Sequence, residues 1–180
     1  MAERRIRTIA DNVLYKPSKL VENFDSQLRD LVRDMYDTMY DANGVGLAAV
    51  QIGVLKRVLV IDLEKSGFIR GTFVNPEVIE MSDELIDSEE GCLSVPGLVS
   101  NLLRPKSVKI KYFNVFGEPQ ELYAQDLLAR AILHEMDHLD GKVFIDLLEP
   151  DRYKVIEDEV EIIRSGESLS EKKLPAYRSN

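Results

Sequence analysis

The segment His134-Glu135-Met136-Asp137-His138 constrains this chain more than any other feature, because its two histidines are the only ones in 180 residues. On an α-helix, residues four apart project from the same face, so both imidazoles could bind one metal ion. Glu135 would lie beside that ion without binding it, where its carboxylate could accept a proton from water. The segment therefore predicts a helix that carries a catalytic metal site.

Three stretches have the apolar spacing of helices. The first covers residues 26–42, and Asp25 can cap its start. The histidine segment falls in the second, from about residue 126 to 139, which stops at Gly141. The third covers about residues 151–164. In the first stretch the spacing predicts that the apolar face packs in the core through Leu28, Leu31, Val32, Met35 and Met39.

Strand patterns lie between the first and second helical stretches. Residues 57–63 form a short apolar, β-branched run, and apolar residues alternate with lysines over residues 108–112. We expect a turn at residues 114–117 and a return strand near residues 120–124. Because strands and helices do not alternate regularly, the sequence predicts an α+β fold with a mainly antiparallel sheet, an N-terminal helix and a C-terminal helix.

The length and composition suit one globular domain, which we expect over residues 1–164, with a flexible tail over residues 165–180 that lacks apolar periodicity. The net charge of −9 argues against binding to the phosphate backbone of DNA or RNA. One cysteine cannot form an intrachain disulfide, and no stretch resembles a signal peptide or a membrane span. We expect a cytoplasmic protein that binds neither DNA nor a membrane.

A catalytic metal site needs a third protein ligand, and the residues leave two sources open. Thermolysin-like proteases use a glutamate about twenty residues downstream, and the third helical stretch offers Glu157, Glu159 and Glu161. The metzincin pattern fails, because Phe144 occupies the position of its third histidine.

Cys92 is the other source. A lone cysteine is usually a small buried hydrophobe, but Gly91, Pro96 and Gly97 indicate tightly turned backbone around this one, which suits a thiolate directed at a metal. Two imidazoles and a thiolate would leave a fourth tetrahedral position open for water.

The segment from Gly44 to Gly53 is a weaker signal. Gly44 and Gly46 permit a close approach of the backbone to another group, and Gln51 lies among small apolar residues, where its amide could be a buried hydrogen-bond donor. A helix end followed by a loop would have the same composition. This segment alone therefore assigns no function.

Taken together, GVGLAAVQ (44–51), EGCLS (90–94) and HEMDHLDG (134–141) resemble, in order and separation, the three signature segments of peptide deformylases. The resemblance covers about Ile6 to Leu148. It implies a mixed, mainly antiparallel β-sheet arrangement wrapped around the helix that carries the HExxH motif, in agreement with the α+β fold expected from the residues themselves.

The resemblance also implies roles for individual residues. The metal ligands would be Cys92, His134 and His138, and Glu135 would be the general acid and base. The Gln51 side chain and the Leu93 backbone N–H would stabilise the oxyanion. Residues implied to contact the substrate, some of them around an apolar pocket for methionine, are Val45, Gly46, Gly91, Leu93 and Ala131.

The implied reaction is hydrolysis of the N-formyl group of N-formylmethionyl nascent polypeptides, which releases formate. The implied cofactor is one divalent metal ion per chain, Fe²⁺ by preference, with Zn²⁺ or Ni²⁺ as alternatives. The resemblance leaves transient association with the ribosome open, although residues 151–164 hold five acidic and three basic side chains and suit RNA poorly.

The sequence departs from the family pattern at Val50, at Leu133 and over residues 97–101, where a polar side chain that contacts the bound peptide is common. Two rival functions remain. The first is a zinc endopeptidase that uses a downstream glutamate. The second is a structural metal site, or an inactive relative that only binds N-termini; the presence of Glu135 and Gln51 argues against it.

Overall fold

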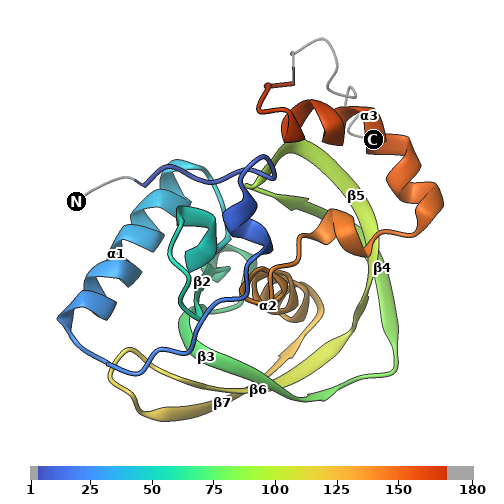
Figure 1. Cartoon of the computed structure of the whole chain (residues 1–180). Coiled ribbons are helices and arrows are strands. Elements are labelled where there is room, and N and C mark those ends of the chain that lie inside the picture. Colours follow the sequence, from blue (N-terminus) through green and yellow to red (C-terminus); the bar gives the residue numbers. More distant parts are fainter. Residues whose placement is uncertain (1–3, 170–180) are drawn as a thin grey trace.

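The computed structural model describes residues 4–169 of the chain. Its helices are α1 (Ser26–Asp41), α2 (Asp126–Leu139) and α3 (Pro150–Arg164), with the short 3-10 helices η1 (Asn12–Tyr15), η2 (Ala49–Ile52), η3 (Glu64–Ser66) and η4 (Phe144–Leu147). Its strands are β1 (Gly46–Ala48), β2 (Val58–Asp62), β3 (Arg70–Met81), β4 (Leu85–Cys92), β5 (Val95–Pro105), β6 (Ser107–Phe113) and β7 (Pro119–Gln125). In Figure 1, α2 lies nearly end-on at the centre and the strands curve around it.

The strands form two antiparallel sheets. One has five strands in the order β1-β2-β3-β6-β7, and the other is the β4–β5 hairpin. All named strand pairs are antiparallel, and the one parallel pairing among the described residues is an isolated bridge between Lys19 and Lys56. The predicted α+β fold, with a mainly antiparallel sheet arrangement around the helix of the HExxH motif, is confirmed.

Strands predicted from apolar runs or alternation are present, and strands with neither feature were missed. Residues 57–63 contain β2, residues 108–112 lie within β6, and the return strand is β7. The sequence did not predict β3, β4 and β5, nor the three-residue strand β1. Most of β3 beyond Val74 is exposed, and β4 buries only Glu90, so neither strand has the apolar alternation of a half-buried strand.

Helix α1 forms where the apolar spacing predicts it, and it ends one residue earlier than expected. The five side chains expected in the core are all buried, and they pack with residues of β1, β2 and β3 in one of two hydrophobic clusters. The carboxylate of Asp25 accepts a hydrogen bond from the Leu28 N–H at 3.0 Å. This N-cap satisfies one of the amide groups left unpaired at a helix start.

Helix α2 crosses the second and larger hydrophobic cluster. Ten of its fourteen residues are buried, which explains why a helix with His and Glu side chains can occupy the centre of the molecule. It ends as predicted at Gly141, whose φ of +73° is left-handed. A Cβ atom at this position would lie 2.8 Å from the carbonyl oxygen of Tyr15, so the N-terminal segment packs directly on the helix end.

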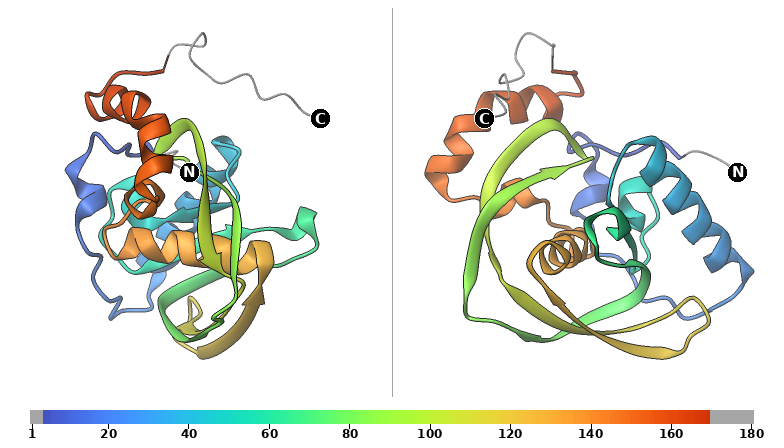
Figure 2. Two further views of the ribbon diagram at one scale, coloured as in Figure 1. Left: turned by 90° about the vertical axis from the view of Figure 1, so that its right-hand side faces the viewer. Right: turned by 180° about the vertical axis from the view of Figure 1, so that it is seen from behind.

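Helix α3 lies along the β4–β5 hairpin, on the side of the molecule away from α1 (Figure 2). Arg152 joins the two by donating hydrogen bonds to the Asp87 carboxylate and to the Asn101 carbonyl, at 2.6 and 2.8 Å. After α3, Leu169 packs against the cluster around α2. Most of the predicted tail, residues 170–180, lies outside the described residues, so its flexibility stays a prediction.

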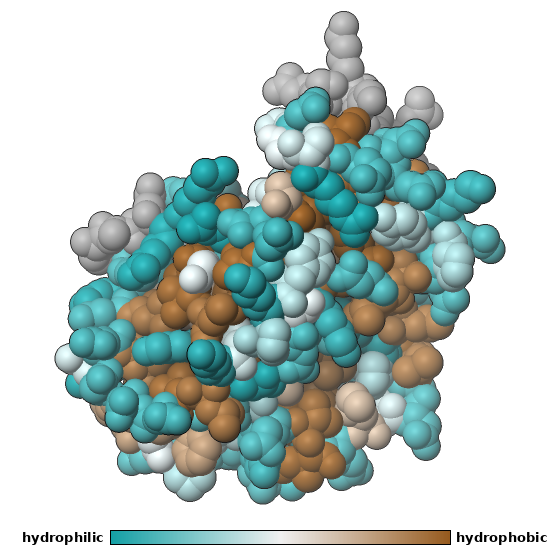
Figure 3. All heavy atoms as spheres, viewed as in Figure 1, coloured by the Kyte–Doolittle hydropathy of each residue, from teal (hydrophilic) through white to brown (hydrophobic). Residues whose placement is uncertain are grey.

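On the face in Figure 3, hydrophilic residues separate the apolar patches from one another. Over residues 4–169, we find no helix with both the length and the apolar character needed to cross a membrane.

Gly141→Ala should lower the free energy of unfolding by about 3 kcal/mol, because the new methyl group adds left-handed strain and meets the Tyr15 backbone. Gly166→Ala is the matched control. Gly166 also follows a helix and has a φ of +86°, but nothing lies within 4 Å of its added Cβ, so about 1 kcal/mol of strain alone is expected. Urea unfolding measures both values. Equal losses would show that the contact with Tyr15 adds no constraint.

Candidate metal centre

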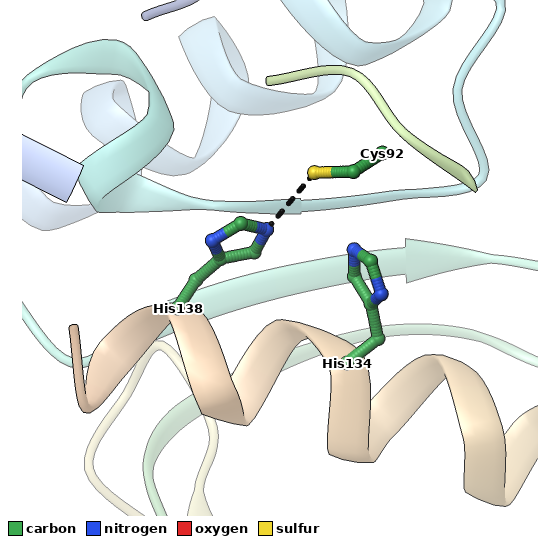
Figure 4. Close-up of side chains that lie close together, drawn as sticks. All are labelled: Cys92, His134 and His138. Carbon is green, nitrogen blue, oxygen red and sulfur yellow. Dashed lines mark hydrogen bonds between the residues drawn. The ribbon is translucent and has the colours of Figure 1, made fainter. Parts of the chain in front are cut away.

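The structure brings together three side chains that can hold a metal ion, Cys92, His134 and His138. Helix α2 projects both imidazoles from one face, and Cys92 reaches them from the end of β4 (Figure 4). Their donor atoms all lie within 4.8 Å of one another, and Cys92 Sγ is 3.2 Å from His138 Nε2. None of the α3 glutamates in the described chain joins this group.

The backbone around Cys92 combines two strands with local irregularity. Cys92 is the last residue of β4, and Val95 is the first of β5, so the cysteine lies at the end of a hairpin. Besides the Leu93–Ser94 turn, the pairing shifts register between Gly91 and Cys92, and Gly97 has a left-handed φ of +81°. Glycine and proline indicated the turn correctly but concealed the strands on both sides of it.

Two donors face the cysteine sulfur. The Ser94 backbone N–H lies 3.4 Å from Sγ, and the Gln51 side-chain amide lies 3.7 Å from it. Gln51 is 1% exposed and is held at both ends, because its Oε1 accepts from the Ala48 N–H at 2.8 Å and its Nε2 donates to Ser94 Oγ at 3.1 Å. Gln51 is therefore a buried, oriented donor next to the candidate metal ligand, as its surroundings in the sequence suggested.

A buried carboxylate, Glu90, positions His134. Its oxygens accept hydrogen bonds from Arg104 Nε at 2.7 Å, Arg130 Nη1 at 2.8 Å and His134 Nδ1 at 2.9 Å. Burial alone would raise the pKa of Glu90, but the hydrogen bonds from Arg104 and His134 outweigh it and hold the pKa at about 2. Because Nδ1 of His134 bonds to the Glu90 carboxylate, its Nε2 remains available as a metal ligand on the side of the ring that faces the Cys92 sulfur.

The two arginines that contact Glu90 tie α2 to the hairpin. Arg104 of β5 also donates to Asp137 of α2 at 2.6 Å. Arg130 of α2 donates to backbone carbonyls of both hairpin strands, at Ser88 and Leu102, over 3.2 and 2.9 Å. No role for Glu90, Arg104 or Arg130 was predicted from the sequence. A glutamate two residues before a candidate ligand was a weak signal, and the arginines had none, because their partners are far away in the chain.

The second acidic residue of the site, Glu135, has no such partners. It is 5% exposed, and no group in residues 4–169 pairs with its Oε2. Burial raises its pKa to about 7. A Cβ atom at Gly46 would lie 2.5 Å from Glu135 Oε1, so this glycine leaves the room that the carboxylate occupies. The close approach predicted at Gly46 is therefore an approach of the Glu135 carboxylate to the Gly46 backbone.

The electrostatics of the three donors suit a cation. Burial lowers the pKa of His138 well below its usual value, so this imidazole is neutral and can donate a lone pair to a metal. At His134 burial acts in the same direction, but hydrogen bonds with Cys92 and Glu90 outweigh it and raise the pKa well above the usual value. The surroundings of His134 therefore favour positive charge. A nitrogen, nitrogen and sulfur donor set in such surroundings fits a divalent transition metal.

A cavity of about 730 Å³ opens beside these donors. Its wall includes the five residues expected to contact the substrate, Val45, Gly46, Gly91, Leu93 and Ala131. Four of the other five predicted site residues also line it: Gln51, Cys92, His134 and Glu135. The sequence missed Val99 and Leu127, which also line it. For Leu127 a signal existed, because it lies one helical turn before Ala131 on α2. The lining is largely apolar, so the cavity suits an apolar side chain next to the metal donors.

Glu90→Gln should lower the free energy of unfolding by about 3 kcal/mol or more, because the buried Arg130 loses its negative partner and the buried Arg104 keeps only Asp137. It should also weaken zinc binding by about 10-fold to 100-fold, because His134 is no longer oriented by a carboxylate.

Asp87→Asn is the control. It removes an exposed carboxylate of the same hairpin, paired with Arg152, and should change stability far less and leave zinc affinity unchanged. Urea unfolding and competition with a zinc chelator measure both. Similar results for the two variants would contradict the orienting role.

Comparisons with known proteins agree with this geometry. The sequence model of the polypeptide deformylase family matches residues 3–154. A peptide deformylase from Clostridium botulinum is 49% identical over 146 residues, which cover 81% of this chain and 97% of that one. A peptide deformylase from Acidothermus cellulolyticus is 50% identical over 155 residues, covering 86% of this chain and 84% of that one.

Solved structures give the same result. A peptide deformylase from Legionella pneumophila superposes with a TM-score of 0.83 at 41% identity, covering 91% of this chain and 96% of that one. A peptide deformylase from Synechococcus elongatus in complex with actinonin has a TM-score of 0.82 at 39% identity, covering 92% of this chain and 89% of that one. The fold, the length of the match and the sequence identity agree: this chain belongs to the peptide deformylase family.

Proposed function

We propose that this protein removes the formyl group from the N-formylmethionyl ends of nascent polypeptides and releases formate. The observation that carries the proposal is the group of Cys92, His134 and His138 beside a buried, unpaired Glu135 at the wall of a largely apolar cavity. The relatives named peptide deformylase support it, as does the related structure that binds actinonin.

Cys92, His134 and His138 would hold one divalent metal ion. When bound, that ion acts as a Lewis acid, which makes water a competent nucleophile near neutral pH and polarises the formyl carbonyl. We propose Fe²⁺ as the native metal, with Zn²⁺ and Ni²⁺ as functional replacements, because all three accept imidazole and thiolate ligands. The hydrogen bond between His134 and Glu90 would keep the imidazole in the tautomer that presents Nε2.

Glu135 would act as general base and then as general acid. Its carboxylate accepts a proton from the attacking water and later delivers that proton to the leaving amine. The position supports both roles, because Glu135 lines the cavity and its Oε2 has no partner among the described residues. The space at Gly46 allows the carboxylate to sit at the cavity wall without a steric conflict.

The Gln51 side chain and the Leu93 N–H would stabilise the charge that develops on the formyl oxygen. Gln51 is already oriented by Ala48 and Ser94, so little reorganisation is needed during the reaction. One such donor is typically worth about 3 kcal/mol in the transition state. Leu93 directly follows Cys92 in the turn, so its N–H is close to the sulfur ligand.

The methionine side chain would enter the apolar part of the cavity. Val45, Leu93 and Ala131 would supply apolar contacts there, and Gly46 and Gly91 would contact the substrate from the same cavity wall. The segment after the Cys92 turn contributes Gly97, Leu98 and Val99 to the cavity in place of a polar side chain. We therefore propose that contacts beyond the first substrate residue are mainly apolar.

The cellular setting follows from the substrate. Nascent chains with formylated ends support a cytoplasmic location, with residues 1–164 as the catalytic domain and residues 165–180 as a flexible tail. Association with the ribosome would be transient, because α3 carries five acidic and three basic residues, a poor match to RNA. We propose no binding to DNA and no membrane anchor, in keeping with the net charge of −9 and the substrate.

The direct test is release of formate from formyl-Met-Ala, measured beside cleavage of an unformylated peptide by the same metal-loaded preparation. The proposal expects formate release and no peptide cleavage. Cleavage of the unformylated peptide without formate release would favour the endopeptidase. Metal binding with neither activity would favour a structural site or a binding-only relative.

Glu135→Gln should lower turnover by at least two to four orders of magnitude, because the amide cannot accept the proton, while bound metal and the melting temperature stay near wild type. Formate release, elemental analysis and thermal unfolding on one preparation separate these effects. Near-normal turnover would rule out Glu135 as the base. Loss of the metal would show that Glu135 belongs among its ligands.

Cys92→Ala should lose metal and activity together, because the described residues offer no other thiolate at the site. Glu157→Ala is the matched control, since a protease of the thermolysin type would need such a glutamate and this one lies at a separate hollow beside α3. Metal content per chain distinguishes the variants. A full equivalent of metal in Cys92→Ala, with loss in Glu157→Ala, would contradict the ligand set.

A further inference from the structure

The backbone of the N-terminal segment bonds to all three segments that carry the candidate site. We call residues 7–18 the N-terminal strap. The Arg7 N–H donates to the Gln51 carbonyl at 2.7 Å, the Ile9 N–H to the Ser94 carbonyl at 3.0 Å, and the Ser18 N–H to the Leu139 carbonyl at 2.8 Å. In Figure 1 the strap runs in dark blue beside α2 and η2.

The first two bonds hold residues that also bind each other. Gln51 Nε2 donates to Ser94 Oγ at 3.1 Å, although the two residues belong to segments 43 positions apart. The strap joins their main chains as well, because Arg7 and Ile9 bond to them from positions two residues apart. Ile9 is 3% exposed and packs in the hydrophobic cluster around α2, which keeps this stretch in place.

Gln51 needs such support, because it lies in η2, a 3-10 helix of only four residues. Carbonyl groups at the end of so short a helix lack partners inside it. The Arg7 N–H is the hydrogen-bond partner of the Gln51 carbonyl. This bond fixes the peptide group next to the Gln51 Cα atom, which carries the side chain. When a hydrogen-bond donor such as the Gln51 amide is displaced slightly from its productive position, it loses much of its effect on the reaction rate.

We infer that the strap is a positioning element for hydrolysis: the peptide N–H of Arg7 holds the main chain of Gln51 in place, so that the carboxamide keeps the orientation that Ala48 and Ser94 give it. This inference rests on the proposed deformylase function and adds a positioning residue to it. The N–H of Arg7 contacts neither substrate nor metal in this account, since it acts only through Gln51. A strap that merely stabilised the fold would affect the melting temperature without a specific effect on turnover through Gln51.

The test is a double-mutant cycle between Arg7→Pro, which removes the N–H, and Gln51→Leu, which removes the carboxamide. Because Arg7→Pro also removes the ion pair between Arg7 and Asp11, its effect is compared with that of Arg7→Ala, which keeps the N–H. On its own, Arg7→Pro should lower kcat for formyl-Met-Ala about tenfold and change KM less than about twofold. In the Gln51→Leu background, the same change should lower kcat less than about twofold, because the group that it positions is gone. Equal losses in both backgrounds, or a change in KM alone, would overturn the inference.

Thr8→Pro is the matched control, because it adds the same ring to the strap at a position where no backbone carbonyl in residues 4–169 accepts the N–H. Its kcat should stay within about twofold of wild type. Should the Arg7→Pro protein not fold, Arg7→Ala is compared with the same variant carrying lactic acid in place of the alanine. That pair differs only in the N–H, and the tenfold loss of kcat should follow its removal.

A second readout does not depend on activity. In an ¹⁵N NMR spectrum of the zinc-loaded protein, the side-chain amide signal of Gln51 is identified by its loss in Gln51→Leu. Its protons should exchange with water at least tenfold faster in Arg7→Pro than in wild type or Thr8→Pro. Unchanged exchange would overturn the positioning role. A wild-type protein that releases no formate, yet shows the faster exchange in Arg7→Pro, would instead contradict the proposed function.

Discussion

A single buried carboxylate, Glu90, joins the two parts of the molecule that supply the candidate metal ligands. Cys92 comes from the two-stranded β4–β5 hairpin, whereas the imidazoles come from α2. Arg104 and Arg130 connect these elements through Glu90. Without this carboxylate Arg104 would keep only Asp137, and Arg130 would be a costly buried charge. The same carboxylate binds His134, so the ion-pair network that docks the hairpin also orients a ligand.

The positions of Glu135 and Gln51 depend on the residues that pack around them. Gly46 leaves space for the Glu135 carboxylate, and burial without a cationic partner distinguishes this acid from Glu90, whose charge is fully compensated. Gln51 is held at its side chain by Ser94 and at its main chain by the N-terminal strap. The pKa of Glu90 is therefore lowered to about 2 by its partners, whereas burial raises the pKa of Glu135 to about 7.

The sequence could predict those features that depend on neighbouring residues in the chain, and not those that depend on contacts between distant residues. Helix α1 buries one face, so its periodicity was visible. Helix α2 buries ten of its fourteen residues, and the four-residue spacing of its histidines indicated that they share a face. Strands β3 to β5 are largely exposed and carry no such period. Arg104 and Arg130 lie 14 and 40 residues from Glu90, so their role depends on the tertiary fold and no local pattern could reveal it.

X-ray absorption spectroscopy of the zinc-loaded protein tests the central claim most directly, because it counts the atoms around the metal. The ligand set of Cys92, His134 and His138 predicts one sulfur at about 2.3 Å and two imidazole nitrogens at about 2.0 to 2.1 Å, with a further light atom completing four-coordination. A spectrum with no sulfur at that distance, or with a carboxylate as the third protein ligand, would contradict it.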